Sequence, residues 1–539
     1  MSRTDPETVT AALVARLAAT GVRLVFGVPG GECNLDLIAA AEAQGLRFVL
    51  TRTETAAAIM ACVAGELTGT VGVAMTTRGP GLAAAANGVA YADLDRAALL
   101  LIADGYEDDQ HWISHQRIDQ RALLAPMLRA SSDLRGCDPL AELDRLLAAA
   151  QGNPPGPAYL EVAGSFIRRP AAPAAPAAPR EPLPALDPAA LTAAADLLAR
   201  ARKPLVLAGL QSRRPAAAAA LSAFATRTSI PVLATYKAKG VVDETTPLGL
   251  GLYAGGVAEE PLMREADLLV LVGFDPVEGP PQRWRYPDSP TLELTDYPFA
   301  IPLVAPTLSV PGDIAASLAA LSHPSPAWDP AAIARHKAAL WSAAAVPGTS
   351  GIAPAALVDA AIAAFPADAR VTIDAGAHML PVLHRWQARE VNQTLISRGL
   401  STMGFALPAA IAACLVDPAR TTLAMTGDGG LMMCLGELGT AVEAGATPIV
   451  IVFNDSALTL IGAKQRRRQL APGGVGFAPC DFARVAHGWG WHANRVERPA
   501  DLAPAFSAAL EATRAGRPAL VDVVVDPASY DEIILAIRG

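Results

Sequence analysis

Short apolar runs alternate with helical stretches along the whole chain, and this alternation constrains the fold more than any other feature of the sequence. The strands of a parallel sheet are covered by helices on both faces, so they are apolar throughout instead of alternating with polar residues. The runs that fit this description are 24–26, 48–50, 71–75, 99–102, 204–208, 231–234, 268–272, 370–374, 423–426, 448–454 and 519–525. The sequence therefore predicts an α/β fold built from doubly wound parallel sheets, in which ligands bind at the carboxyl ends of the strands.

Two proline-rich breaks divide these runs into three groups. Residues 169–188 contain proline at a density that excludes a helix or a central strand, which predicts an extended linker. A second cluster of prolines lies near residues 323–329. A chain of 539 residues is too long for one core. We therefore expect three tandem doubly wound parallel-sheet domains, at residues 1–165, 186–325 and 350–539.

Composition excludes several classes of protein. Hydrophobic residues make up 52% of the chain and charged residues 18%, which excludes a disordered chain. The net charge of −9 argues against a nucleic-acid or anionic-membrane partner. No apolar run approaches the ~20 residues that span a bilayer, and residues 1–10 precede no apolar signal segment. The six cysteines form no C-x-x-C pair, as expected for reduced thiols, so we expect a cytoplasmic protein.

The most informative segment joins two predicted strands of the third domain. Gly427-Asp428-Gly429-Gly430 follows the first strand and opens a helix, and Asn454 ends the second strand. Glycines allow backbone N–H groups to approach a phosphate at a helix start. A carboxylate from Asp428, an amide oxygen from Asn454, a backbone carbonyl and phosphate oxygens would form the octahedral oxygen site that suits Mg²⁺.

This pattern resembles the signature of the thiamine diphosphate-dependent enzymes, in which Gly-Asp-Gly is followed after about 25 residues by Asn. The resemblance covers nearly the whole chain and implies a pyrimidine-binding domain, then a central domain, then a diphosphate-binding domain. It implies thiamine diphosphate and Mg²⁺ as cofactors, with Asp428, Asn454 and Ser456 as metal ligands. The implied cofactor contacts of this segment are Gly427, Asp428, Gly429, Gly430, Asn454, Ser456, Ala457 and Leu458.

Glu54 matches the activating glutamate of the same family. It follows the predicted strand 48–50 at the start of a helix. The resemblance implies that this catalytic carboxylate hydrogen-bonds the pyrimidine ring of the cofactor. The histidine that precedes the glutamate in the family is replaced here by Thr53.

Four further turns resemble cofactor-binding segments of the family. Met403 matches the apolar residue beneath the thiazolium ring, and residues 374–378 match a second turn that holds the diphosphate. Residues 26–31 and 77–81 match turns near the pyrimidine end. The cofactor contacts implied by these segments are Gly30, Pro80, Asn87, Ala375, Gly376, Ala377, His378, Ser401 and Met403.

Two segments are similar to those of catabolic acetolactate synthases. Residues 114–123 resemble a stretch whose active-site glutamine corresponds to Gln116. Residues 273–278 match a turn of the same enzymes, and the FAD-containing enzymes have a different segment at that place. The resemblance thus implies an FAD-independent carboligase that decarboxylates a 2-oxo acid, pyruvate first, and joins the product to a second carbonyl compound. It also implies a homodimer or homotetramer with active sites between chains, because Glu54 of one chain meets cofactor bound to its neighbour.

Other functions stay open at this point. A non-oxidative 2-oxo-acid decarboxylase or an aldehyde lyase with another substrate fits the same motifs, as does a flavin-dependent oxidase. A non-catalytic binding module would have no evident reason to keep all these residues. Pyruvate decarboxylases usually carry an adjacent His-His pair, whereas His111 and His115 are separated. Thr53, Ile59 and Lys464 depart from the pattern expected near the pocket, so a 2-oxo acid or aldehyde larger than pyruvate stays open.

Overall fold

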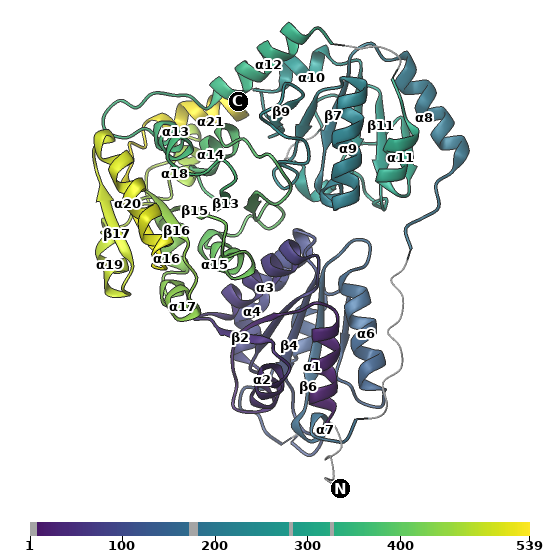
Figure 1. Cartoon of the computed structure of the whole chain (residues 1–539), viewed down its shortest axis with the longest axis vertical. Helices are drawn as coiled ribbons and strands as arrows, with labels where there is room; N and C mark the ends of the chain where they lie inside the picture. Colours follow the sequence, from purple (N-terminus) through teal and green to yellow (C-terminus); the bar gives the residue numbers. More distant parts are fainter. Residues whose placement is uncertain (1–7, 111, 172–181, 280–283, 324–327) are drawn as a thin grey trace. The chain divides into compact units, whose positions relative to one another are not determined.

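The computed structural model describes residues 8–110, 112–171, 182–279, 284–323 and 328–539, which form two compact units (Figure 1). Unit 1 comprises Met1–Glu181, Gly399–Ala419 and Cys434–Pro448. Unit 2 comprises Pro182–Arg398, Arg420–Met433 and Ile449–Gly539. Most of the predicted linker and of the second proline-rich break lies outside the described residues, as does His111. The three domain boundaries stay predictions.

Unit 1 contains a six-stranded parallel sheet in the order β2-β1-β3-β4-β6-β5. The strand order reverses between β1 and β3, and this topological switch point is where open α/β sheets bind ligands. The strands are β1 Leu24–Val28, β2 Arg47–Leu50, β3 Gly72–Thr76, β4 Leu99–Asp104, β5 Ala130–Ser132 and β6 Pro157–Val162.

Helices cover both faces of this sheet. On one face, α1, α2 and α6 bury leucines against β3 and β4. On the other face α3 packs on β1 and β3, and α4 and α15 pack against α3. A Cβ at Gly88 of α4 would overlap Ala58 of α3, so small residues allow these two helices to approach closely. The helices of unit 1 are α1 Val9–Ala19, α2 Cys33–Ala43, α3 Glu54–Thr68, α4 Pro80–Leu94, α5 Gln120–Leu124, α6 Pro139–Ala150, α7 Gly164–Ile167, α15 Ala406–Val416 and α17 Glu437–Ala444.

The first sheet of unit 2 has the strand order β12-β11-β10-β7-β8-β9, with its switch point between β7 and β10. Successive residues of β7 face opposite cores: Leu205 and Leu207 point to one, Val206 and Ala208 to the other. Its strands are β7 Pro204–Ala208, β8 Val232–Ala234, β9 Gly249–Leu252, β10 Leu268–Val272, β11 Thr291–Thr295 and β12 Leu308–Pro311. Its helices are α8 Pro188–Arg200, η1 Leu210–Arg213, α9 Pro215–Thr228, α10 Glu260–Glu265, η2 Pro276–Glu278, α11 Ile314–Ala320 and α12 Pro330–Ala343.

The second sheet of unit 2 has the order β14-β13-β15-β16-β18-β17, with its switch point between β13 and β15. Its core joins strand residues such as Ile373 and Ile451 to Phe506 of α20 and Ile533 of α21. The strands are β13 Arg370–Ile373, β14 Thr394–Ile396, β15 Thr422–Gly427, β16 Ile449–Asn454, β17 His492–Val496 and β18 Ala519–Val524. The helices are α13 Pro354–Ala364, α14 Met379–Arg385, α16 Asp428–Met433, α18 Thr459–Arg467, α19 Phe482–Gly488, η3 Pro499–Asp501, α20 Leu502–Arg514 and α21 Ser529–Arg538.

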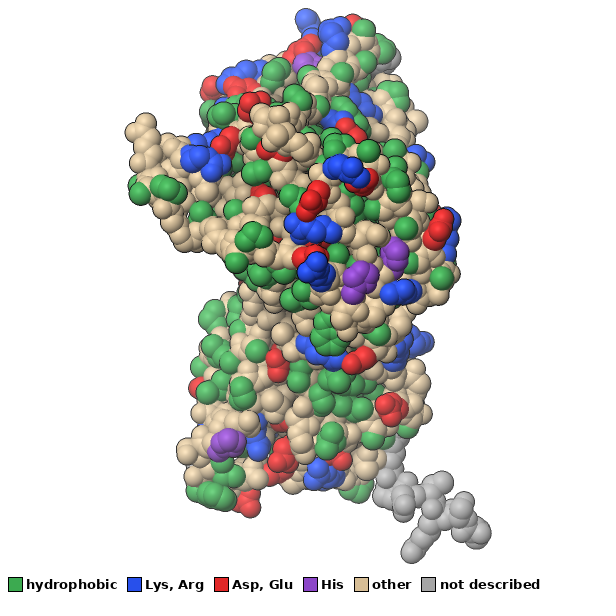
Figure 2. Space-filling model, turned by 90° about the vertical axis from the view of Figure 1, so that its left-hand side faces the viewer, with side chains coloured by type: hydrophobic (Ala, Val, Ile, Leu, Met, Phe, Trp, Pro, Cys, Tyr) green, Lys and Arg blue, Asp and Glu red, His purple; other side chains and the backbone are tan. Residues whose placement is uncertain are grey.

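The predicted fold class is confirmed, because all three sheets are parallel and flanked by helices. Each of the eleven predicted apolar runs coincides with a strand. Within the described ranges no helix is long and apolar enough to cross a membrane. On the face shown in Figure 2, basic and acidic side chains are interspersed among apolar ones.

Candidate active site

Glu54 is the first residue of α3, and two interactions fix the turn that carries it. The Thr53 side chain caps the helix by accepting a hydrogen bond from the Ala56 N–H at 3.2 Å. The carboxylate of Glu437, the first residue of α17, accepts hydrogen bonds from the backbone N–H groups of Arg52 (3.2 Å) and Thr53 (3.0 Å). Burial raises the pKa of the Glu54 carboxyl, so the proton is held more tightly than on an exposed glutamate.

Gly30 and Gly81 follow β1 and β3, at the switch point of the unit 1 sheet. A Cβ at Gly30 would overlap Oδ2 of Asp104, and a Cβ at Gly81 would lie 3.0 Å from Oε1 of Glu54. The Gly30 N–H donates to Asn34 Oδ1 (3.0 Å), and Asn34 Nδ2 donates to Asp104 Oδ1 (2.8 Å). Burial raises the pKa of Asp104 to about 6. Each turn thus brings backbone close to a carboxyl group, and at Gly81 a Cβ would also overlap Thr76 Oγ1.

Pro80 and Asn87 lie on α4, and the segment carrying Ser401 and Met403 docks on the same helix. Pro80 begins α4 at a position where its missing N–H costs nothing. Thr402 Oγ1 donates a hydrogen bond to Asn87 Oδ1 at 3.1 Å. Ser401 is exposed with a φ of 54°, and Met403 is half-buried. Unit 1 therefore brings Asn87 beside the segment that was expected to support the cofactor ring.

Gln116 lies in the loop between β4 and α5, directly over the start of α4. It is exposed and has a φ of 58°. A Cβ at Gly79 would overlap the Gln116 carbonyl oxygen, so the two backbones are in contact. The Gly79 N–H donates to Oε1 of the buried Gln120 at 2.9 Å. The loop is therefore fixed at its second end, next to Pro80.

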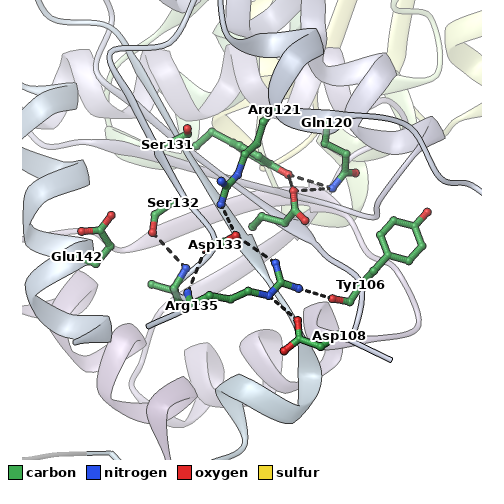
Figure 3. Close-up of polar contacts among 12 residues, drawn as sticks. Tyr106, Asp108, Gln120, Arg121, Ser131, Ser132, Asp133, Arg135 and Glu142 are labelled. Carbon is green, nitrogen blue, oxygen red and sulfur yellow. Dashed lines mark hydrogen bonds and ion pairs between the residues drawn. The ribbon is translucent and has the colours of Figure 1, made fainter. Parts of the chain in front are cut away.

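Arg135 fixes the first end of the same loop (Figure 3). Its guanidinium donates to the Tyr106 carbonyl (2.7 Å) and to Asp108 Oδ1 (2.8 Å). Its third contact is with Asp133, at 3.1 Å. The Tyr106 hydroxyl in turn donates to the His115 carbonyl at 3.2 Å, next to Gln116. A chain of contacts thus holds the Gln116 backbone while its side chain stays exposed to solvent.

In unit 2 the Asp428 carboxylate joins the ends of two neighbouring strands. Asp428 begins α16 directly after β15. Its Oδ1 accepts the Gly429 N–H at 2.7 Å, and its Oδ2 accepts the N–H groups of Asp455 (3.1 Å) and Ser456 (2.5 Å). Burial raises the pKa of the Asp428 carboxyl. This geometry brings Asp428 beside the segment that follows Asn454.

Asn454 ends β16 with its amide held on one side only. Its Nδ2 donates to Asp522 Oδ1 (2.8 Å) and to the Cys480 carbonyl (2.9 Å). Its Oδ1 accepts no hydrogen bond from any described residue. Beyond it, Ser456 has a φ of 57°, the Ala457 N–H donates to Asp455, and the Leu458 N–H donates to Val475.

The turn after β13 lies on the other side of the switch point. The Ala375 N–H donates to Asp374 Oδ1 at 3.1 Å, and a Cβ at Gly430 would overlap Asp374 Oδ2. Ala377 is buried, and a Cβ at Gly376 would lie 2.7 Å from the His378 ring. The two glycine-bearing turns of the switch point are thus packed on Asp374 and His378.

His378 is the buried polar side chain of this turn. Its ring stacks on Phe453 with centroids 5.3 Å apart, and a Cβ at Gly427 would lie 3.2 Å from its Nδ1. Burial lowers the pKa of His378 to about 4, so the ring is neutral at pH 7. Its Nε2 is buried without a hydrogen-bond partner.

These residues fit Mg²⁺ and a diphosphate group. Buried polar atoms without partners are rare in folded proteins, and unit 2 leaves the buried His378 Nε2 without a partner beside the switch point. Asn454 Oδ1, at the end of the next strand, β16, accepts no hydrogen bond from any described residue. In the described part of the chain no three or more His, Cys, Asp and Glu side chains form a group that could hold a metal. A metal at Asp428 therefore needs amide, carbonyl and phosphate oxygens, which are ligands that Mg²⁺ accepts.

Sequence reasoning missed four residues that shape the candidate site residues of unit 1 and those of unit 2. Glu437 and Asn34 hold the turns that carry Glu54 and Gly30, and Asp104 and Asp522 stand behind Gly30 and Asn454. One signal was present: Asp522 interrupts an otherwise apolar strand. Their contacts join segments far apart in the sequence, which no local pattern reveals.

Comparisons with known proteins agree with this arrangement. The family models for the thiamine pyrophosphate enzymes match three stretches: the N-terminal TPP binding domain at residues 7–123, the central domain at 191–321 and the C-terminal TPP binding domain at 374–523.

Similar proteins cover almost the full length. A catabolic acetolactate synthase of Raoultella terrigena is 29% identical, over 95% of this chain and 94% of the relative. An acetolactate synthase of Bacillus subtilis is 28% identical, over 95% and 92%. A probable 2-ketoarginine decarboxylase of Pseudomonas aeruginosa is 32% identical, over 91% and 89%.

Proposed function

Since this chain belongs to the thiamine pyrophosphate enzyme family, we propose that it is a carboligase of the acetolactate synthase type. It would decarboxylate a 2-oxo acid, pyruvate first, and join the remaining fragment to a second carbonyl compound. The observation that carries the proposal is the Asp428–Asn454 pair at a sheet switch point, with Asn454 Oδ1 and His378 Nε2 unpaired. Similarity to two acetolactate synthases supports the choice of reaction.

Thiamine diphosphate, when bound, supplies the electron sink that makes loss of CO₂ from a 2-oxo acid feasible. In unit 2, Asp428, the Asn454 amide oxygen and Ser456 would bind Mg²⁺. The turns at 375–378 and 427–430, followed by Ala457 and Leu458, would hold the diphosphate, with His378 as a neutral donor.

In unit 1, Glu54 would hold a proton at the pyrimidine ring of the cofactor. Its raised pKa suits a group that shares a proton with a weakly basic ring nitrogen. Gly30, Pro80, Asn87, Ser401 and Met403 would line the same half-site. The exposed side chain of Gln116, on its fixed backbone, would orient the second carbonyl compound.

The proposal extends to assembly and to flavin. We include in it a homodimer or homotetramer in the cytoplasm, in which Glu54 of one chain contacts the cofactor bound to a partner chain. We also propose that the reaction needs no FAD. The support is the switch point of the central sheet, where the Glu278 carboxylate accepts the Leu210 N–H (2.6 Å) and the Thr235 hydroxyl (2.6 Å).

A second candidate is a non-oxidative decarboxylase or lyase that acts on a larger 2-oxo acid or aldehyde. The observation that favours it is the 32% identity with a probable 2-ketoarginine decarboxylase, against 29% and 28% for the two synthases. This candidate uses the same residues for cofactor and metal. It differs in releasing a free aldehyde instead of forming a new carbon–carbon bond.

Product analysis separates the two. Purified protein is incubated with thiamine diphosphate, Mg²⁺ and pyruvate without FAD, and products are measured before and after acid treatment. Acetoin released by acid is the expected result, because acetolactate loses CO₂ in acid. Free acetaldehyde without acetoin would contradict the carboligase. Bound cofactor without turnover of pyruvate would overturn the substrate, and larger 2-oxo acids, including one with a guanidinium group, would be compared next.

A further inference from the structure

We propose that Asp522 is a positioning residue that fixes the Asn454 amide, so that its oxygen and not its nitrogen is presented to the metal. The inference rests on the proposed function, because it takes Asn454 as a ligand of Mg²⁺. It concerns the residues behind the ligand, which form a closed ring of hydrogen bonds.

The ring contains Asn454, Asp522, Arg495 and the Cys480 carbonyl. Asn454 Nδ2 donates to Asp522 Oδ1 (2.8 Å) and to the Cys480 carbonyl (2.9 Å). Arg495 Nη1 donates to Asp522 Oδ2 (2.8 Å) and to the same carbonyl (3.2 Å). Asp522 Oδ2 also accepts the Phe482 N–H at 3.0 Å.

Sheet register builds the ring. Arg495 of β17 lies directly opposite Asp522 of β18, and Asn454 of β16 lies opposite Val524, two residues further along β18. Residues two apart on a strand share a face. Asp522 and Asn454 therefore project from the same face of neighbouring strands, and their side chains meet.

The chemistry of the ring decides the orientation of the amide. Both groups that face Asn454 from behind are acceptors, one a carboxylate and one a carbonyl. A flipped amide would place Asn454 Oδ1 against these two oxygens, and both oxygens would lose the hydrogen bond from Asn454 Nδ2. The observed orientation leaves Oδ1 free, which is the atom that binds a hard cation.

Burial makes the placement of Asp522 significant. Asp522 has no exposed surface, and its strand is otherwise apolar. A buried charge is costly unless it is paired and fully hydrogen-bonded, and here Arg495 and two further N–H donors, from Asn454 and Phe482, meet this condition. The carboxylate thus brings a strong, fixed acceptor to the back of Asn454.

The test measures binding of Mn²⁺ to the full-length protein by electron paramagnetic resonance, in the presence of saturating thiamine diphosphate. Asp522→Asn keeps the shape of the side chain but replaces the carboxylate, one of the two acceptors behind Asn454, by an amide that can also donate. The Asn454 amide is then free to flip. Residues behind metal ligands typically contribute 10- to 100-fold in affinity, and we expect a loss of about that size. Arg495→Lys keeps a cation and both acceptors, and we expect its affinity to stay within about threefold of wild type.

A double variant shows whether Asp522 acts through Asn454. We expect Asn454→Ala to weaken Mn²⁺ binding, and Asp522→Asn to add nothing further in that background. The inference would be overturned if Asp522→Asn reduced Mn²⁺ affinity by the same factor in the wild-type and Asn454→Ala backgrounds. It would also be overturned if Arg495→Lys reduced Mn²⁺ affinity as much as Asp522→Asn does. If Asn454→Ala leaves Mn²⁺ affinity unchanged, the metal assignment of the proposed function fails instead.

Melting temperatures of the cofactor-free variants establish that each is folded. If Asp522→Asn does not fold, Asp522→Ser replaces it, because its hydroxyl can donate as well as accept. The same loss of Mn²⁺ affinity is then expected, and wild-type affinity would equally overturn the inference.

Discussion

The two sheets of unit 2 differ in whether the polar groups at their switch points already have hydrogen-bond partners. In the central sheet, the backbone N–H groups of residues 209–211, directly after β7, are paired with other groups of the same sheet. The Gly209 N–H donates to Val272 (2.8 Å), the Leu210 N–H to Glu278 (2.6 Å), and the Gln211 N–H to Gly273 (3.0 Å). In the other sheet, His378 Nε2 beside the switch point between β13 and β15 has no partner, and Asn454 Oδ1 at the end of the next strand, β16, accepts no hydrogen bond from any described residue.

The difference shows that topology alone does not make a binding site. Both sheets offer carboxyl ends of parallel strands at a reversal of strand order, which is the usual place for a ligand. What separates them is whether backbone carbonyls and side chains of the same sheet already satisfy the polar groups there. Glu278 takes the position of an anion in the central sheet, whereas the other sheet keeps donors and acceptors available.

The largest effect on cofactor and metal binding is expected when a carboxylate is removed at the open switch point. Asp428→Ala should abolish retention of thiamine diphosphate and Mg²⁺, weakening binding more than about 100-fold. Isothermal titration calorimetry measures this directly. The matched control is Asp275→Ala, because Asp275 is a buried aspartate that follows β10 at the closed switch point. Similar losses in both variants would break the comparison.

A second effect separates binding from turnover. Glu54 lies in unit 1, outside both compared sheets, so Glu54→Gln should leave cofactor and metal affinity within about threefold. Removing a group that exchanges a proton during turnover typically costs 100- to 10,000-fold, and we expect kcat to fall by about that range. Steady-state kinetics with pyruvate, run beside calorimetry, checks both values. A variant with wild-type kcat would remove Glu54 from the mechanism.

Two histidines on neighbouring turns of one segment give a third, smaller test. His378 is buried and His384 is half-buried, both have pKa values lowered to about 4 by desolvation, and both leave Nε2 unpaired. His378→Phe should weaken thiamine diphosphate binding about tenfold, the effect of about one lost hydrogen bond. His384→Phe should leave that affinity unchanged, because His384 lies away from the switch point, in a cavity lined by Glu244 and Lys337. Equal losses by calorimetry would argue that burial alone, and not position, matters.

The sequence predicted the central parts of each sheet well. The eleven apolar runs all became strands, because buried parallel strands need apolar residues on both faces. Five of the seven unpredicted strands, β5, β9, β12, β14 and β17, lie at sheet edges, and all of these but β14 are only partly buried, so their apolar pattern is weaker.

For the candidate site, the sequence located the turns but not what holds them. Strand ends and glycines are local features, and they predicted that Asp428 and Asn454 meet at the carboxyl ends of neighbouring strands, while the family resemblance added His378. The contact of Glu437 with Thr53 joins residues 384 apart in sequence, and that of Asp522 with Asn454 joins residues 68 apart. Such contacts depend on packing between elements, so they require the folded structure.

The smallest expected effect lies at the closed switch point and concerns stability instead of binding. Burial and the nearby charge of Asp275 raise the pKa of Glu278 to about 7. An exposed glutamate in the unfolded chain titrates near 4.3, so between about pH 4 and about pH 7 the folded chain binds the proton more tightly. The free energy of unfolding contributed by this group is therefore greatest at low pH and is lost as the pH rises through that window.

Glu278→Gln removes this titration while keeping an acceptor for the Leu210 N–H. The melting temperature of wild type relative to the variant should fall by about 3 °C between about pH 5 and about pH 8 in differential scanning calorimetry. Cofactor affinity should be the same in both proteins, since the Glu278 carboxylate is already used within the central sheet. A pH-independent difference would contradict the raised pKa. A change in thiamine diphosphate affinity would show that the central switch point is not separate from the site, and the contrast between the two sheets would then fail.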